Sequence, residues 1–287
     1  MKIAFIGLGV MGYPMAGHQQ LQGHSVCVYN RTESKAQAWA KQYNGNYAPT
    51  PRQASEGADC VMTCVGNDDD VRSVVYGEQG VLAGLDTGGT LIDHTTTSHA
   101  LALELSEACS QQNISFLDAP VSGGQRGAEN GKLSVMAGGD HSVLEQVKKA
   151  ILPYAKAITL MGPVGSGQMT KMVNQILIAG VLQGISEGLT LARKSELDLP
   201  KVIKAVSGGA AGSWQLSNNG QTIIEDKFDF GFAIDWMIKD LGFCLESAEA
   251  LALNLPNTLH AMAEYKKLQA KGYHRCDTSV LIKQFDD

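Results

Sequence analysis

The chain has 287 residues, enough for one large domain or two of ordinary size. Its apolar fraction of 44% and charged fraction of 18% are typical of a soluble globular protein. The net charge is -6 and no basic run occurs, which disfavours nucleic acid and membranes as partners. Six scattered cysteines form neither a CxxC pair nor a His/Cys metal pattern, so we expect reduced thiols, a cytoplasmic protein and no metal site.

The first thirty residues combine a glycine motif with strand and helix patterns. Strand, helix and strand patterns follow one another over residues 2–6, 13–22 and 25–29. Between the first two lies the motif Gly7-Leu8-Gly9-Val10-Met11-Gly12. In a dinucleotide-binding unit, Gly7 allows the tight turn, Gly9 lets the backbone reach the pyrophosphate, and Gly12 lets helix and strand pack closely. We therefore expect a dinucleotide whose phosphates meet the helix N-terminus and, because the chain enters a strand at once, no signal peptide.

The end of the second predicted strand indicates which dinucleotide is bound. An NAD enzyme usually places Asp or Glu here to hold the ribose 2′-hydroxyl. This chain has Asn30-Arg31-Thr32 instead, so no carboxylate repels a 2′-phosphate and Arg31 can bind one with two hydrogen bonds. Asn30 and Thr32 add neutral donors. The sequence therefore predicts NADP(H) in preference to NAD(H).

Polar residues follow two of the later strand patterns. The later strand patterns are five in all and cover residues 60–65, 90–93, 114–121, 133–139 and 157–161; the polar residues follow the first two. Three consecutive aspartates at residues 68–70 suggest either a metal site or, as the favoured interpretation, the negatively charged start of a helix through residues 71–75. His94 begins a run with several hydroxyl groups, and we interpret it as a packing histidine in preference to a base.

A serine and two glycines end the run Asp118-Ala119-Pro120-Val121-Ser122-Gly123-Gly124. The hydroxyl of Ser122 and the N–H groups of Gly123 and Gly124 can form a cradle for an anion such as a carboxylate. A plain turn is the alternative when this segment is taken alone.

A long apolar helix is predicted over residues 164–194, after a glycine-rich corner. Gly165 and Gly167 mark places where the backbone approaches another group closely. Because the helix is apolar on every side, we expect neighbours to bury it all round, and its polar residues argue against a membrane span. Its length, on the order of 45 Å, exceeds what one small domain covers, so we expect a homodimer or homotetramer.

Lys171 and Asn174 lie three residues apart on one face of this helix. A lysine in apolar surroundings tends to have a lowered pKa and can then act as a general acid or base near neutral pH. The alternative is a lysine that extends its charge to solvent.

Residues beyond 176 show helix patterns and no convincing strand. Trp214 follows a glycine-rich break, where it could close over a site or serve as a core or interface residue. Lys239-Asp240 lies in a helical pattern over residues 232–253, and from the residues alone we expect a solvated pair of opposite charges.

Four motifs, in this order, resemble the β-hydroxyacid dehydrogenase family, which includes 3-hydroxyisobutyrate dehydrogenase, tartronate semialdehyde reductase and the glyoxylate/succinic semialdehyde reductases. They are the motif at residues 7–12, the run at residues 118–124, the segment at residues 162–174, and Lys239-Asp240-Leu241. The resemblance spans essentially the whole chain. It implies an α/β Rossmann-type N-terminal domain (residues 1–163) followed by an all-α C-terminal domain (residues 164–287), joined by the long helix at residues 164–194, with the active site between them.

The resemblance also assigns roles to single residues. Lys171 matches the catalytic lysine, Asn174 the residue that orients the substrate, and Lys239 the lysine that closes over substrate and nicotinamide. The loop that holds the substrate carboxylate is matched by Ser122, Gly123 and Gly124, with Trp214 and Asp240 as further candidate substrate contacts. Further cofactor contacts are matched by Val65, Gly66, Asp70 and Thr96. Relatives often carry Leu-Pro where this chain has Val65-Gly66, a change that a backbone contact tolerates.

We therefore expect reversible hydride transfer between NADP(H) and a short carboxylate substrate, a β-hydroxy acid or semialdehyde such as 3-hydroxyisobutyrate, succinic semialdehyde or glyoxylate. The alternatives are imine reduction, oxidative decarboxylation as in 6-phosphogluconate dehydrogenases, and a non-enzymatic NADP-binding protein. Imine reductases usually lack a lysine at the position of Lys171, and the C-terminal part is short for a 6-phosphogluconate dehydrogenase. A non-enzymatic protein has no need of Lys171, Asn174 and Ser122 together.

Overall fold

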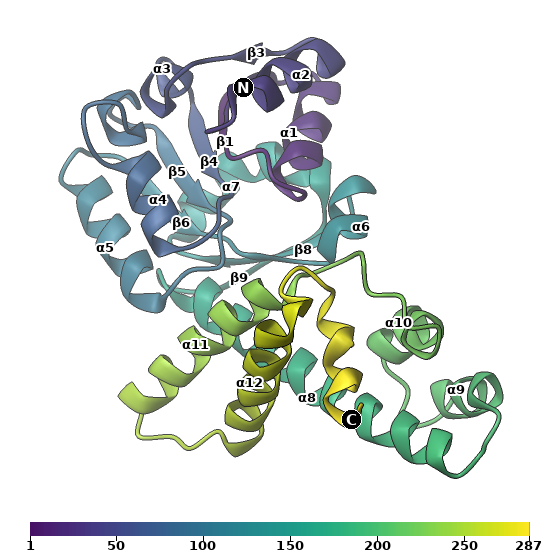
Figure 1. The fold of residues 1–287 in the computed structure, drawn as a ribbon. Coiled ribbons are helices and arrows are strands. Elements are labelled where there is room, and N and C mark those ends of the chain that lie inside the picture. The colour runs from purple at the N-terminus through teal and green to yellow at the C-terminus, as the bar shows by residue number, and fades with distance from the viewer. Residues whose placement is uncertain (287) are drawn as a thin grey trace. The chain divides into compact units, whose positions relative to one another are not determined.

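A computed structural model describes residues 1–286 and divides them into two compact units (Figure 1). Unit 1 comprises Met1–Lys171, and unit 2 begins at Met172. The boundary falls inside α8 (Ser166–Lys194), so this continuous helix contributes its first turns to unit 1 and the rest to unit 2.

Unit 1 is a sheet flanked by helices. Its strands are β1 (Lys2–Ile6), β2 (Ser25–Tyr29), β3 (Asn46–Tyr47), β4 (Cys60–Thr63), β5 (Thr90–Asp93), β6 (Ser115–Asp118), β7 (Val121–Ser122), β8 (Leu133–Gly138) and β9 (Ala155–Gly162). Its helices are α1 (Gly12–Leu21), α2 (Glu33–Tyr43), α3 (Pro51–Ser55), α4 (Asp68–Val75), η1 (Val81–Ala83), α5 (His99–Ser110), α6 (Gly124–Glu129), α7 (His141–Ile151) and η2 (Leu152–Tyr154).

The strand order is β3-β2-β1-β4-β5-β6-β8-β7, with β9 paired to β8. The strands from β3 to β6 in that order are parallel, which is the doubly wound arrangement of dinucleotide-binding folds. Strand β8 runs antiparallel to β6 and β7 and parallel to β9. The single strand predicted over residues 114–121 is wrong, because the chain divides there into β6 and β7 around Pro120, which has no N–H to donate to a sheet.

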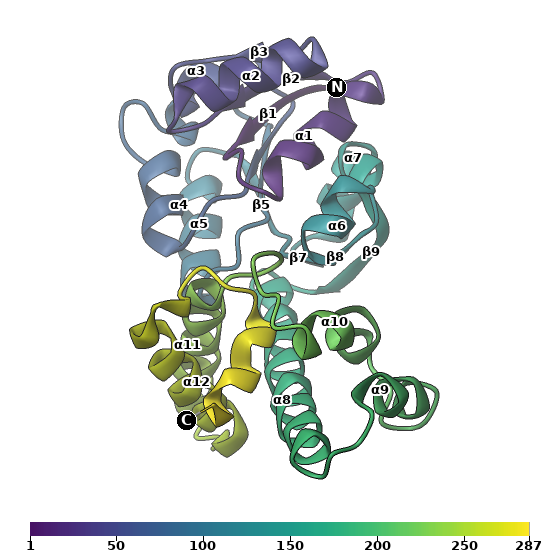
Figure 2. The ribbon, with the colours of Figure 1, turned by 45° about the vertical axis from the view of Figure 1, so that its right-hand side comes forward.

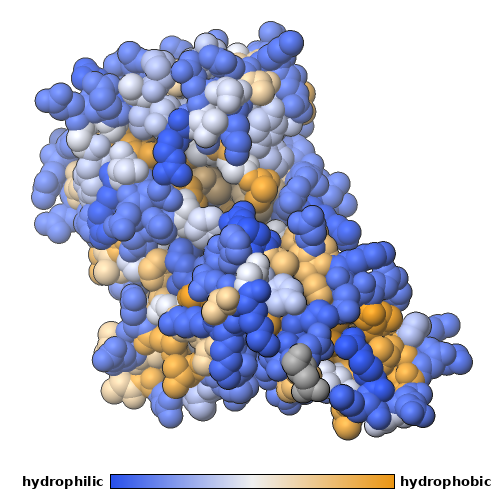
Figure 3. All heavy atoms as spheres, in the orientation of Figure 1, coloured by the Kyte–Doolittle hydropathy of each residue, from blue (hydrophilic) through white to orange (hydrophobic). Residues whose placement is uncertain are grey.

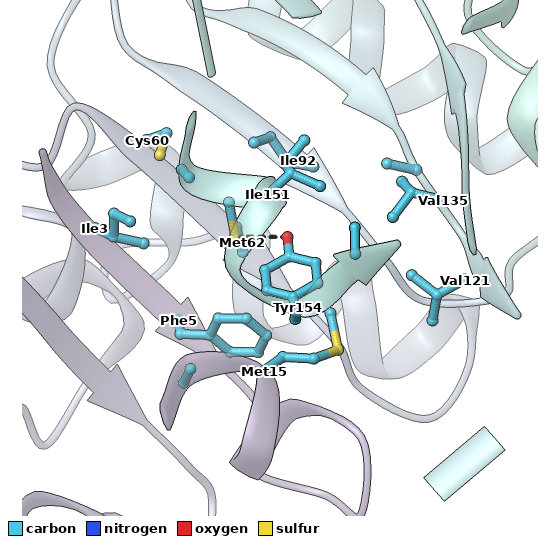
Figure 4. Packing of buried hydrophobic residues seen from close by; sticks show 14 of the residues in the cluster. Ile3, Phe5, Met15, Cys60, Met62, Ile92, Val121, Val135, Ile151 and Tyr154 are labelled. Atoms are coloured by element: carbon cyan, nitrogen blue, oxygen red, sulfur yellow. Dashed lines mark hydrogen bonds between the residues drawn. The ribbon is translucent and has the colours of Figure 1, made fainter. Parts of the chain in front are cut away.

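Helices cover both faces of this sheet, and each face has its own apolar core (Figure 2). Side chains alternate along β1, so that Ile3 and Phe5 join one core while Ala4 and Ile6 join the other. Figure 4 shows the first core packed around Tyr154. With both faces buried, polar groups concentrate at the carboxyl ends of the strands, where open α/β sheets bind ligands.

Unit 2 is helical, as the sequence predicts, apart from a single bridge between Ala233 and Asp277 among the described residues. Besides the later turns of α8 it contains α9 (Leu199–Ser207), α10 (Trp214–Ile224), α11 (Ile234–Ala250), α12 (Pro256–Leu268), η3 (Gln269–Tyr273) and η4 (Thr278–Phe285). The buried carboxylate of Asp277 holds the C-terminal segment by accepting hydrogen bonds from the N–H groups of Phe232 and Ser279.

The expectation that neighbours bury α8 all round is wrong for the single chain. Leu177 and Leu191 are 62% and 71% exposed, and Val173 and Val181 are also exposed. On the face of unit 2 shown in Figure 3, hydrophobic side chains also gather at the surface over α9 and α10. By length and composition alone, α8 could cross a membrane, a test that the core helix of a soluble protein also passes.

Candidate cofactor and active site

The glycine motif adopts a strand–turn–helix geometry between β1 and α1. Gly7 has a φ of +102°, which favours glycine, and a Cβ on Gly12 would lie 2.1 Å from the carbonyl oxygen of Gly7. A Cβ on Gly9 would meet no atom within 4 Å, so this backbone is open to a ligand. Among the described residues, no side chain caps the N-terminus of α1. Its N–H groups and helix dipole are therefore suited to the pyrophosphate of a dinucleotide.

The side chain of Asn30 braces this loop. Its Oδ1 accepts a hydrogen bond from the N–H of Leu8 at 2.9 Å, and its Nδ2 donates to the carbonyl oxygen of Thr32 at 3.0 Å. Arg31 is exposed, and its Nη1 lies 3.4 Å from Oδ1 of Asp70. The guanidinium assigned to the 2′-phosphate thus faces a carboxylate, in an exposed pair of the kind that contributes little stability.

Asp93 joins the loops that follow β4 and β5. Its Oδ1 accepts hydrogen bonds from Oγ1 of Thr63 at 2.7 Å and from the N–H of Thr95 at 3.0 Å. Thr95 in turn accepts a hydrogen bond at Oγ1 from the N–H of Val65 at 3.1 Å. Burial raises the pKa of Asp93 to about 6, although these hydrogen bonds oppose the shift. The predicted cofactor contacts in these two loops are Val65, Gly66 and Thr96.

Lys171 lies beside the loop predicted to hold a carboxylate. Its buried Nζ donates a hydrogen bond to the carbonyl oxygen of Val121 at 3.0 Å, directly before Ser122. Gly123 and Gly124 have φ values of +135° and +62°, which favour glycine and turn the chain from β7 into α6. The alternative of a lysine extended to solvent is wrong, and unit 1 brings the predicted catalytic amine and the predicted carboxylate loop together.

Asn174, three residues further along α8, begins a chain of polar contacts in unit 2. Its Nδ2 donates to Oε1 of Gln175 at 2.7 Å, and Nε2 of Gln175 donates to Oδ2 of Asp240 at 2.6 Å. Nζ of Lys239 lies 3.2 Å from Oδ1 of Asp240. The ammonium group is also 5.9 Å and 5.3 Å from the ring centroids of Trp236 and Phe243. These contacts fix the predicted substrate-orienting amide and the predicted closing lysine to one carboxylate.

The expectation of a solvated pair at Lys239 and Asp240 is wrong. The side chain of Asp240 is only 1% exposed, because it falls on the face of α11 that also buries Met237 and Leu241. A buried carboxylate must be paired or hydrogen-bonded, and Gln175 and Lys239 meet that need. Direct substrate contact by Asp240 stays a prediction, as does that by Trp214, which begins α10 and is 59% exposed.

Comparison with known proteins assigns the family. Residues 2–162 match the family model described as the NAD binding domain of 6-phosphogluconate dehydrogenase. Residues 165–285 match the model described as NAD-binding of NADP-dependent 3-hydroxyisobutyrate dehydrogenase. The chain is also 36% identical to the 2-hydroxy-3-oxopropionate reductase of Escherichia coli (strain K12), over 100% of its own length and 97% of that relative. This chain belongs to the β-hydroxyacid dehydrogenase family.

Two further proteins are similar to this β-hydroxyacid dehydrogenase over almost the whole chain. An oxidoreductase of Shewanella frigidimarina (strain NCIMB 400) is 53% identical, over 99% of this chain and 98% of the relative. The solved structure of Mycobacterium tuberculosis 3-hydroxyisobutyrate dehydrogenase with L-serine is 29% identical, with a TM-score of 0.90 over 100% of this chain and 99% of that one. The chain is therefore an NAD(P)-dependent hydroxyacid dehydrogenase with a Rossmann-type domain followed by a helical domain.

Two buried residues near the site of this β-hydroxyacid dehydrogenase were not predicted from the sequence. Both Gln168 and Gln175 are amides on α8, and both are fully or almost fully buried. A buried amide among methionines and aliphatic residues must be hydrogen-bonded. The position of an amide within an otherwise apolar helix pattern could therefore have identified Gln168 and Gln175 as buried, hydrogen-bonded residues.

The three aspartates at the start of α4 have separate partners. Asp68 accepts hydrogen bonds from the N–H and hydroxyl groups of Ser98, at 3.0 Å and 2.5 Å. Asp69 lies 3.6 Å from Arg72, and Asp70 is the partner of Arg31 described above. The predicted charged helix start is confirmed, with the aspartates as the first three residues of α4. Among the described residues, no group of three or more His, Cys, Asp or Glu side chains is placed to hold a metal.

Proposed function

We propose that this β-hydroxyacid dehydrogenase transfers hydride reversibly between NADP(H) and a short β-hydroxy acid or semialdehyde. The observation that carries the proposal is the position of Lys171, whose buried Nζ donates to Val121 immediately before the Ser122-Gly123-Gly124 loop. An amine beside a carboxylate-binding loop suits a small acid whose reacting oxygen lies a few bonds from its carboxylate. Candidate substrates are 3-hydroxyisobutyrate, succinic semialdehyde and glyoxylate, and with NADPH as cofactor we propose aldehyde reduction as the physiological direction.

The cofactor and the site residues have separate roles in the proposed reaction. When bound, the cofactor supplies or accepts the hydride. Lys171 gives a proton to the substrate oxygen during reduction and takes it back during oxidation. Asn174 hydrogen-bonds the same oxygen, with its amide oriented by Gln175. The hydroxyl of Ser122 and the N–H groups of the two following glycines hold the substrate carboxylate.

The proposal of NADP(H) is supported by the β2 end of unit 1. Asn30 replaces the carboxylate that would repel a 2′-phosphate, and Arg31 presents an exposed guanidinium there. Asp70 opposes this preference, because Arg31 must exchange that carboxylate for the phosphate. Their exposed pairing is weak, so the exchange costs little.

Lys171→Ala tests the role of the amine. We expect kcat to fall by roughly 10²–10⁴-fold, because the substrate oxygen loses its proton donor, while NADPH still binds. Lys194→Ala, at the exposed end of the same helix, is the control and should keep wild-type kcat. Initial rates and NADPH fluorescence measure the two quantities, and near wild-type turnover of Lys171→Ala would exclude the proposed role.

A panel of succinic semialdehyde, glyoxylate and methylmalonate semialdehyde, run with NADPH and NADH, tests the substrate class. Cyclic imines and 6-phosphogluconate serve as the competing substrates. We expect the highest kcat/KM for one of the aldehydes with NADPH. Preferential turnover of an imine or of 6-phosphogluconate would refute the proposed substrate class.

We also propose a homodimer or homotetramer in a reducing, cytoplasmic compartment. The exposed apolar face of α8, with Leu177 and Leu191, supports self-association. The six cysteines are all free thiols, which is common in reducing compartments.

A further inference from the structure

Buried polar contacts that the proposed mechanism does not use fix the first turns of α8 to the sheet. The carboxylate of Asp118, at the end of β6, accepts hydrogen bonds from the N–H of Gly165 at 2.7 Å and from the N–H of Gln168 at 2.8 Å. The side chains of Asp118 and Gln168 are fully buried. Asp118 thus caps α8 from a strand far away in sequence, with its carboxylate at the positive end of the helix dipole.

The side chain of Gln168 extends this anchor to the loop after β5. Its Nε2 donates to the carbonyl oxygen of Thr95 at 2.8 Å, and its Oε1 accepts a hydrogen bond from the N–H of Thr97 at 3.1 Å. Thr96, a predicted cofactor contact, lies between these two backbone groups. An amide that uses both its donor and its acceptor on one loop fixes the distance and the orientation of that loop.

Close backbone packing leaves α8 little room to move. A Cβ on Gly167 would lie 2.4 Å from the carbonyl oxygen of Met136 and 2.7 Å from that of Asp118. Because Lys171 follows Gln168 by three residues, both side chains lie on one face of the helix. A shift of this turn would therefore move Nζ of Lys171 away from the carbonyl oxygen of Val121.

We propose that Gln168, held by Asp118, is a positioning residue that places Lys171 relative to the loop after β5 and to the Ser122-Gly123-Gly124 loop. This assignment rests on the proposed function, in which Lys171 transfers the proton. Misplacing a catalytic group by about 1 Å can lower a rate about 100-fold, so the anchor acts on kcat. The anchor does not touch the glycine loop proposed to hold the pyrophosphate, and its contact with the predicted cofactor site is limited to the loop of Thr96.

A double-mutant cycle of Gln168→Met and Lys171→Ala tests the assignment, with NADPH and the aldehyde that gives the highest kcat in the panel. Methionine keeps the approximate volume of glutamine and removes the amide. We expect Gln168→Met to lower kcat about 10- to 100-fold in the presence of Lys171, and by at most about twofold in the Lys171→Ala background. The Kd of NADPH should stay within about threefold of wild type, because the glycine loop is intact.

Two results would overturn the positioning role alone. The first is that Lys171→Ala lowers kcat as expected while Gln168→Met keeps wild-type kcat. The second is that Gln168→Met lowers kcat by the same factor with Lys171 present and in the Lys171→Ala background. A Lys171→Ala variant with near wild-type kcat overturns the proposed function first, and the positioning role with it. The three patterns of rates are distinct, so the failure of one proposal is separable from the failure of the other.

Gln19→Met is the matched control. Gln19 is a fully buried amide on α1, and its Nε2 donates to the carbonyl oxygen of Ala150 at 2.8 Å. Its replacement should lower the melting temperature as Gln168→Met does and leave kcat within about twofold of wild type. Equal losses of kcat in both variants would overturn the positioning role. If Gln168→Met does not fold, Asp118→Asn, which removes one acceptor of the anchor, replaces it in the cycle with the same outcomes.

Discussion

At the scale of single residues, the proposed preference for NADP(H) depends on whether the guanidinium of Arg31 pairs with a 2′-phosphate or with Asp70. Arg31 and Asp70 belong to the segments that follow β2 and β4, and their side chains meet at 3.4 Å. A 2′-phosphate carries more charge than a carboxylate and accepts two hydrogen bonds from arginine, so it should displace Asp70. The remaining carboxylate would then repel the phosphate, and the repulsion would weaken as salt increases.

Asp70→Asn should therefore strengthen NADPH binding. We expect the KM for NADPH to fall by about two- to fivefold, as for loss of one exposed charge, with little change in the KM for NADH. Asp69→Asn makes the same charge change one residue away, where the carboxylate faces Arg72, and should leave the ratio of the two KM values unaltered. Initial rates with both cofactors at fixed ionic strength measure this. A ratio unaffected by Asp70→Asn would mean that the phosphate is held elsewhere.

The sequence could indicate those site residues whose side-chain type is unusual for their surroundings and belongs to a local motif. Lys171 and Ser122 were identified because an amine and a hydroxyl are unusual in their surroundings and match a family motif. Gln168 and Asp93 were not identified, because their partners come from segments distant in sequence: Gln168 contacts Thr95 and Thr97, about seventy residues earlier. No local pattern encodes such pairings, which depend on the strand order of the finished sheet.

At the scale of elements, the buried end of β5 carries two neighbouring titratable groups, Asp93 and His94, whose pKa values shift in opposite directions. His94 follows β5, and its Nδ1 lies 2.6 Å from the carbonyl oxygen of Ala119 while its Nε2 lies 2.7 Å from the hydroxyl of Tyr154. A carbonyl oxygen can only accept, so Nδ1 carries the proton and Nε2 accepts from Tyr154. The expectation that His94 is a packing residue is confirmed. Burial lowers its pKa to about 4, whereas burial raises that of Asp93 to about 6.

These shifts predict opposite effects of pH on stability. Between pH 4 and 6.5 the unfolded chain protonates His94 and the folded chain does not, so His94 makes the free energy of unfolding rise with pH, by about 3 kcal/mol in all. Between pH 3.8 and 6 the folded chain holds a proton on Asp93 that the unfolded chain has lost, so Asp93 makes the same quantity fall with pH, by about 3 kcal/mol.

Urea unfolding of His94→Gln and Asp93→Asn across this range separates the two groups. His94→Gln should lose stability relative to wild type as pH rises from 4 to 6.5, because the variant lacks the increase in the free energy of unfolding that His94 gives the wild type over this range. Asp93→Asn should gain stability relative to wild type over pH 3.8 to 6. Differences from wild type that are flat with pH would show that neither group titrates as its burial implies.

The arrangement of elements was predictable to the extent that it is local. The glycine motif, the alternation of strands and helices, and the span of α8 all follow from short patterns. The division of residues 114–121 into β6 and β7 escaped prediction because the apolar residues on both sides of Asp118 predict one strand, and the prediction did not account for Pro120 as its end. The burial of Asp240 also escaped prediction. Whether a side chain is buried depends on its position in the helical repeat of α11 more than on its charge, and Asp240 shares a face with Met237 and Leu241.

At the scale of the whole molecule, α8 presents an apolar seam that the single chain does not cover. Its exposed positions include Val173, Leu177 and Leu191, at spacings that keep them on one side of the helix. Along the same helix, a Cβ on Gly180 or Gly184 would meet no atom within 4 Å. Large side chains beside open glycines allow another helix to approach closely, and a second copy of this chain would supply the same seam.

Leu177→Glu tests whether this seam joins subunits. Burying a carboxylate without a partner in an apolar helix contact is costly. We therefore expect the mass in sedimentation equilibrium to fall from two chains to one if the wild type is a dimer, and from four chains to two or one if it is a tetramer. Leu251→Glu is the control, because Leu251 is a comparably exposed leucine that follows α11 and lies off the seam. It should keep the wild-type mass. A wild-type protein that sediments as a single chain would refute self-association, and an unchanged mass for Leu177→Glu would place the subunit contact on another surface.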